Sequence, residues 1–60
     1  MRTFSCFTSD SRSSVPTLAF IFAEDEVRVR LLARRELLDT KHAVSVEICE
    51  GGKLLWTEWA

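Results

Sequence analysis

The stretch that decides the fold is "AVSVEICEGGKLLWTEW", residues 43–59. Apolar and polar side chains alternate before the glycine pair, as they do in a strand with one buried face, and the segment after it is again rich in apolar and aromatic residues. Gly51-Gly52 is typical of a two-residue hairpin turn with positive φ. The opposite charges of Glu50 and Lys53 suit the positions on either side of that turn. The stretch therefore predicts an antiparallel hairpin.

Counting outward from the turn assigns the side chains of this hairpin to two faces, because directly opposed residues point the same way. One face is mainly apolar and is made of three pairs: Ile48 with Leu55, Val46 with Thr57, and Val44 with Trp59. The other face is mixed and is made of Cys49 with Leu54, Glu47 with Trp56, and Ser45 with Glu58.

The mixed face of the predicted hairpin contains the first candidates for an interface. An aromatic side chain exposed within an apolar patch usually marks a contact surface, and Trp is enriched where binding energy concentrates. Trp56, Leu54 and Cys49 are therefore candidate interface residues. The alternative is a monomer in which Trp56 lies flat and half buried over its neighbours.

A helix is predicted before the hairpin, in "AEDEVRVRLLARRELLD", residues 23–39. Asp25 suits the N-cap, and the acidic residues around it complement the positive end of the helix dipole. Good helix formers then continue to about Asp39. One apolar side of this helix consists of Val29, Leu32, Ala33 and Leu37, and the other of Val27, Leu31 and Leu38.

Two apolar sides are more than packing on a single sheet requires. We expect the side with Ala33 to meet the sheet, because a small residue permits close approach. The other side, which includes Leu31 and Leu38, would meet the sheet edge, the loop at 9–15 or a second subunit, and both leucines are interface candidates. The two sides could also be exchanged.

Two more strands are predicted near the N-terminus, "TFSCFT" at residues 3–8 and "TLAFIF" at residues 17–22. Both faces of the second are apolar, which indicates that both are covered. Between them "SDSRSSVP", residues 9–16, is a loop and the segment expected to be most mobile. Residues 1–60 therefore form a single α+β domain, ββαββ, with a four-stranded, mainly antiparallel sheet and one helix packed on one face. Strand order 2-1-3-4 keeps every neighbour antiparallel, and 1-2-3-4 is the alternative.

The arginines of the helix raise the question of nucleic-acid binding. Three acidic residues lie four positions from Arg28, Arg30 and Arg35, a spacing that places opposite charges side by side on a helix. This pattern favours a solvated face over the uncompensated basic face of a nucleic-acid reader. Only Arg34 lacks such a neighbour; with Arg30 it could hold a carboxylate or phosphate of a partner.

The remaining residues give no support for catalysis or for a bound cofactor. Net charge is −1, with eight Lys+Arg against nine Asp+Glu, so a general polyanion binder is disfavoured. One histidine, His42, and two cysteines without a Cys-x-x-Cys spacing provide no zinc set, and no metal or cofactor is expected. Cys6 and Cys49 are expected to be inert and reduced, and "EGGK" lacks the spacing of a phosphate loop.

The segments "FAEDEVRVRLLARRELLD" and "HAVSVEICEGGKLLW" resemble a group of short bacterial uncharacterised proteins with the same strand–strand–helix–strand–strand pattern. The resemblance covers about residues 20–56 and implies a fold without implying an activity. A weaker resemblance is to HicB-type antitoxins, which combine a short sheet with one helix and carry a Gly- and Pro-rich strand signature. Here Pro16 is the only proline, and no glycine precedes Gly51.

The expected function is that of a small non-enzymatic protein that acts through protein–protein contact. A chain of 60 residues buries only about 60% of its unfolded surface and usually needs further stabilisation from a disulfide, a metal or an oligomer. Here we expect that stabilisation to come from a second copy of the chain. Another protein is a further possible partner, and a nucleic-acid-linked regulator or antitoxin-like module is the alternative function. The longest apolar run, residues 18–23, is far too short for a membrane span, so a cytoplasmic protein without membrane contact is expected.

Overall fold

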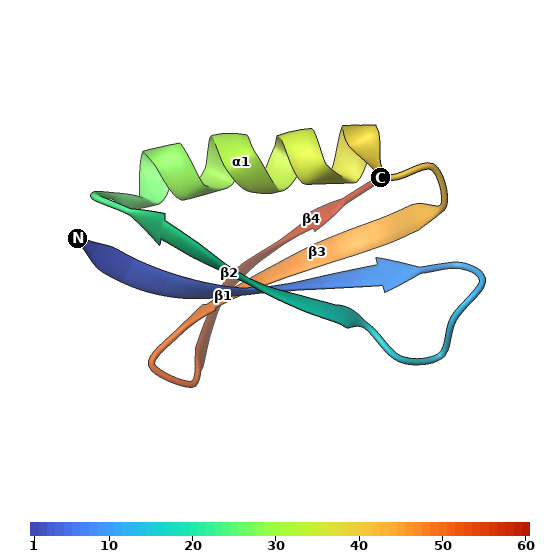
Figure 1. Cartoon of the computed structure of the whole chain (residues 1–60), viewed down its shortest axis with the longest axis horizontal. Coiled ribbons are helices and arrows are strands. Elements are labelled where there is room, and N and C mark those ends of the chain that lie inside the picture. The colour runs from blue at the N-terminus through green and yellow to red at the C-terminus, as the bar shows by residue number, and fades with distance from the viewer.

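The computed structural model describes all 60 residues, Met1 to Ala60. Its elements are β1 (Arg2–Asp10), β2 (Thr17–Ala23), α1 (Glu26–Asp39), β3 (Ala43–Glu50) and β4 (Lys53–Trp59). The strands form one sheet in the order β2-β1-β3-β4, with every neighbouring pair antiparallel. The predicted α+β ββαββ fold and its 2-1-3-4 strand order are confirmed. Figure 1 shows α1 lying along one side of the sheet, with no element on the other side.

Both ends of α1 have clear local causes. Asp25 has an extended backbone, and its carboxylate accepts a hydrogen bond from the backbone N–H of Arg28 at 2.9 Å, which is the N-cap arrangement that the sequence predicts. At the other end the N–H of Thr40 donates to the carbonyl oxygen of Glu36 at 3.0 Å before the chain extends. With 14 residues, this single helix is not long and apolar enough to cross a membrane.

The hydrophobic core lies between α1 and the sheet. It consists of eight buried residues: Phe4, Cys6, Ala23, Val29, Ala33, Leu37, Val46 and Ile48. Full burial of side chains such as Phe4 or Ile48 contributes about 1.5–3 kcal/mol each. The predicted choice of helix side is confirmed, since α1 buries Val29, Ala33 and Leu37 and exposes Leu31 and Leu38 on its outer side.

The predicted register of the β3–β4 hairpin is correct at the turn and wrong beyond it. Gly51 and Gly52 have φ values of 60° and 79°, and Glu50 pairs with Lys53 and Cys49 with Leu54 as counted. An irregularity between Ile48 and Cys49 then adds one residue to β4, and the later pairs become Ile48 with Trp56, Val46 with Glu58, Glu47 with Thr57 and Ser45 with Trp59. A bulge of this kind re-aims every side chain that follows it.

The physical gain from the bulge is that Leu55 and Trp56 both pack against the core instead of only one of them. Trp56 and Glu58 consequently lie on the side of the sheet that α1 covers, together with Val46 and Ile48. Trp59 moves to the uncovered side of the sheet, where the uninterrupted count had placed Trp56.

A second irregularity separates Ser9 from Asp10 on β1, because Ser9 pairs with Ser45 and Asp10 pairs with Ala43. Val44 is exposed and has no partner in β1. The predicted pair of Val44 with Trp59 is also wrong, because Trp59 pairs with Ser45. Since β1 extends to Asp10, the connection to β2 covers residues 11–16, two residues fewer than predicted. The backbone N–H of Ser11 donates to the carbonyl oxygen of His42 and ties this connection to the start of β3.

Candidate interaction surface

The side of the sheet turned away from α1 is named the open face. The pairing register places side chains of all four strands there. Strand β2 contributes three apolar residues, the central strands β1 and β3 contribute a mixed set each, and β4 contributes three residues. Its members are Leu18, Phe20, Phe22, Thr3, Ser5, Phe7, Ser9, Ser45, Glu47, Cys49, Leu54, Thr57 and Trp59. No helix or loop lies on this face in Figure 1, and apart from Ser45, which is buried, these side chains are partly or largely exposed.

The apolar residues of the open face form two flanks along its outer strands. On β2 the flank consists of Leu18, Phe20 and Phe22, and on β4 it consists of Leu54 and Trp59. Their side chains are between 49% and 70% exposed, which is unusual for large apolar residues in regular strands. Between the flanks lie mainly hydroxyl side chains. Monomers rarely leave this many large apolar side chains uncovered on one face, and such surfaces mark sites of interaction.

Glu47 is the single charged residue on the open face. It lies near the centre, between Phe7 on β1 and Thr57 on β4. No ion pair or side-chain hydrogen bond of the structure includes its carboxylate. The same face carries hydroxyl side chains, such as Thr57 opposite Glu47 on β4, that can donate to a carboxylate which a partner buries.

The structure separates the interface candidates that the sequence had grouped. Leu54 and Cys49 are paired on the open face, whereas Trp56 is half buried on the helix side. The guanidinium carbon of Arg30 lies 4.7 Å from the centre of the Trp56 ring, a cation–π contact that covers the indole. The Nε1 atom of Trp56 is buried without a hydrogen-bond partner.

Leu31 and Leu38 are exposed on the outer side of α1, on the opposite side of the molecule from the open face. Their spacing with Val27 makes a narrow stripe of isolated apolar side chains between arginines. Scattered surface leucines of this kind are ordinary in soluble proteins, whereas three large apolar side chains in a row on one strand, with two more on the opposite edge of the same face, are not. The open face is therefore the stronger candidate.

The arginines of α1 differ from the predicted ladder of neighbours. Only the predicted pair of Arg35 with Asp39 forms, with 3.6 Å between Nε and Oδ2. The predicted contacts of Glu24 with Arg28 and of Glu26 with Arg30 are absent. Glu26 instead accepts from Arg2 at 3.4 Å, and Arg30 turns to the Trp56 ring. Arg34, the second anion candidate, has no carboxylate within 4 Å.

A second group of ion pairs lies at the end of the sheet where the chain begins. Arg2 donates from Nε to Oε2 of Glu50 at 2.8 Å and from Nη2 to Oε1 of the same carboxylate. These hydrogen bonds, opposed by partial desolvation, hold the pKa of Glu50 below its ordinary value and raise the pKa of Arg2. The contact joins the start of β1 to the end of β3, and we assign it a structural role.

The structure brings no catalytic group together around the cysteines. Cys6 is buried in the core, and this burial raises the pKa of its thiol, so the reactive thiolate is disfavoured. Cys49 lies on the open face, and both cysteines are free. No three His, Cys, Asp or Glu side chains are placed to hold a metal ion.

Sequence reasoning left Trp59 out of the candidate surface because of the bulge in β4, and it also left out Leu18, Phe20 and Phe22 of β2. Their signal is visible as the alternation within "TLAFIF", which places them together on one side of a strand. That alternation does not say which side the helix covers, because both sides of this strand are apolar. Comparison with protein-family models, with curated proteins and with solved structures found no match to this chain.

Proposed function

We propose that this protein acts through protein–protein contact, as a homodimer whose two subunits meet through their open faces. The observation that carries the proposal is the exposure of Phe20, Phe22 and Trp59 on a sheet face that no element covers. Burial of one such side chain is worth about 1.5–3 kcal/mol. A chain with only ten buried residues among 60 has much to gain from this burial.

The pattern of the open face is self-complementary, which is what a twofold dimer needs. The apolar flanks lie on the outer strands β2 and β4, and the polar residues lie mainly between them. When two such faces meet about a twofold axis in the plane of contact, apolar flanks lie on apolar flanks. This holds whether the axis runs along the strands or across them. A second copy therefore covers the flanks without burying a charge against them.

The size of the open face is sufficient for this contact. Figure 1 looks down the shortest axis of the molecule and shows the strands one behind another, with α1 along one side. The face thus spans the longest and shortest extents of the molecule, 33 and 15 Å, or about 500 Å². Two copies that covered the whole face would bury about 1,000 Å² in total, which is the lower limit for a biological interface and less than the roughly 1,200–2,000 Å² of stable ones.

The test is the molar mass in solution of the native chain and of two matched variants, measured by size-exclusion chromatography with light scattering. Phe20 on the open face and Leu31 on the outer side of α1 are 59% and 60% exposed. Phe20→Glu places a charge in the proposed interface, and Leu31→Glu places the same charge outside it. We expect the native chain and Leu31→Glu to have twice the monomer mass at micromolar concentration, and Phe20→Glu to have the monomer mass.

A monomeric native chain over the same concentrations would overturn the proposal. So would dissociation by Leu31→Glu with Phe20→Glu still dimeric, because that result would move the interface to α1. Circular dichroism of each variant shows whether the fold is retained, and both residues are exposed enough for the monomer to tolerate the change.

The alternative, a nucleic-acid-linked regulator, draws its support from Arg28 and Arg34, which have no acidic partner. The opposing observations are the net charge of −1 and the use of Arg30 and Arg35 within the protein. Binding to duplex DNA at low salt, with a steep loss as salt rises, would favour this alternative.

A further inference from the structure

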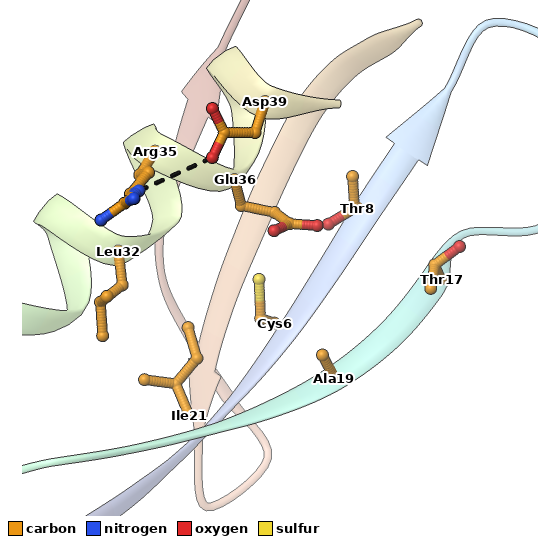
Figure 2. A pocket seen from close by; sticks show the side chains of 9 residues that line it. All are labelled: Cys6, Thr8, Thr17, Ala19, Ile21, Leu32, Arg35, Glu36 and Asp39. Carbon is orange, nitrogen blue, oxygen red and sulfur yellow. Dashed lines mark ion pairs between the residues drawn. The ribbon is translucent and has the colours of Figure 1, made fainter. Parts of the chain in front are cut away.

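A cavity of about 380 Å³ lies on the helix side of the sheet, between the second half of α1 and the strands β1 and β2. It is separate from the open face, because the sheet lies between the two. Figure 2 shows nine side chains around it, and they come from three elements. The volume is at the lower end of the range of small-molecule sites.

The cavity exists because β2 runs away from α1 toward its start (Figure 1), and the side chains that it presents there are too short to fill the space. Ala23 and Ile21 pack under the first half of the helix, where they are buried and half buried. Farther along the strand the same side carries Ala19 and Thr17, which are short and exposed. The space between them and Leu32 of the helix is left unfilled.

One wall of the cavity is apolar and the other is polar. Ala19, Ile21 and Leu32 form the apolar part, together with the thiol of Cys6 at the bottom. Thr8 and Glu36 form the polar part, and in Figure 2 the carboxylate of Glu36 projects into the cavity from α1.

Two polar groups of this wall have unused hydrogen-bonding capacity. Thr8 is only 7% exposed, and its hydroxyl has no partner apart from the Cys6 thiol beside it. The carboxylate of Glu36 accepts one weak hydrogen bond, from the Thr40 hydroxyl at 3.3 Å, and forms no ion pair. At the rim, by contrast, Asp39 is neutralised by Arg35. Glu36 is itself exposed, so its carboxylate is accessible at the mouth of the cavity, and the Thr8 hydroxyl lies buried behind it.

We infer that this cavity binds a small amphipathic amine, with its ammonium group on the Glu36 carboxylate and its apolar body against Ala19, Ile21 and Leu32. An ammonium group complements the Glu36 carboxylate, which forms no ion pair in the subunit, and its further protons can be shared with the Thr8 hydroxyl. An anionic ligand would meet Glu36 as a like charge. This site does not depend on the dimer, because it lies on the other side of the sheet.

The test is a titration with 2-phenylethylamine followed through the backbone amide signals in NMR spectra of the native chain. We expect saturable shifts that centre on Thr8, Ala19 and Glu36. The uncharged analogue 2-phenylethanol should bind at least tenfold more weakly, because it lacks the charge-assisted hydrogen bond. Shifts that do not saturate, or equal binding of the amine and the alcohol, would overturn the inference.

Three variants assign the binding to the cavity. Glu36→Gln removes the charge and should weaken binding of the amine at least tenfold, whereas Glu24→Gln, at an exposed position outside the cavity, should leave that affinity unchanged. Ala19→Leu fills the cavity from an exposed strand and should abolish the shifts without loss of thermal stability. Native affinity in Glu36→Gln, or in a folded Ala19→Leu, would place the amine elsewhere and refute the site.

Discussion

At the scale of single residues, the contacts that shape this protein are short-range and of different origins. The Asp25 cap stops α1 from extending into β2, and it could be read from the sequence because its cause lies within four residues. Arg2 and Glu50 are 48 positions apart, and their contact depends on two strands meeting at one end of the sheet. No local spacing in the sequence predicts a contact between residues so far apart.

The Arg2–Glu50 contact makes the stability of the fold depend on pH. The folded state holds the pKa of Glu50 below its ordinary value of 4.5 through the hydrogen bonds from Arg2. The stabilisation is therefore fully present above that value and is lost as the pH falls through the lowered pKa. We expect Glu50→Gln to melt at a lower temperature than the native chain at pH 7, and the gap to narrow on acidification to pH 3.

The matched control for Glu50 is Asp10→Asn. Asp10 has a pKa that is lowered by hydrogen bonds from Arg12, within its own turn. Asp10→Asn should retain the part of the acid sensitivity that belongs to Glu50. A constant difference in melting temperature between Glu50→Gln and the native chain from pH 7 to 3 would show that the pair is not coupled to folding.

At the scale of elements, the hairpin of β3 and β4 shows where sequence reasoning succeeds and where it stops. The turn was predictable because Gly51 and Gly52 meet a local requirement for positive φ, and both have it. The bulge in β4 was not predictable, because it is selected by the packing of Leu55 and Trp56 against the core. A count of alternating residues assumes an unbroken ladder and has no means of placing an extra residue.

The glycine pair is expected to contribute through backbone conformation alone. A Cβ at Gly51 or Gly52 would meet no other atom within 4 Å, so an alanine there would suffer only from its positive φ. Each Gly→Ala change should lower the free energy of unfolding by about 1 kcal/mol. The measurement is urea-induced unfolding at a fixed protein concentration. Lys53→Ala, at a position without positive φ, should cost less than half as much. Equal losses at all three positions would mean that side-chain contacts, and not φ, hold the turn.

At the scale of the whole molecule, the existence of an uncovered apolar surface could be predicted, but the residues that form it could not. One helix lies over one side of a sheet whose other side is also apolar, so an uncovered apolar surface was expected from composition and length. Which residues lie on it depends on which side of β2 faces α1 and on the bulge in β4. For that reason Phe20 and Trp59 were missed and Trp56 was expected there.

The dimer should respond to the charge at the centre of the open face. Glu47 has no partner in the subunit, and burial of a carboxylate between two faces costs more than burial of an amide of the same shape. We expect Glu47→Gln to lower the dissociation constant of the dimer by about five- to tenfold, measured by sedimentation equilibrium. Glu58→Gln, on the helix side, should leave that constant unchanged. A weaker dimer in Glu47→Gln would mean that the carboxylate accepts hydrogen bonds across the interface.

The bulge in β4 has one more consequence, which is optical. Because it places Trp56 and Trp59 on opposite sides of the sheet, the two indoles of this chain sense different surroundings. Trp56 sits beside a guanidinium over the packed interior, so its fluorescence follows unfolding. Trp59 faces outward, so its emission should shift to shorter wavelength when a companion chain displaces water from it. Replacing either one by phenylalanine leaves a chain whose remaining emission reports a single event.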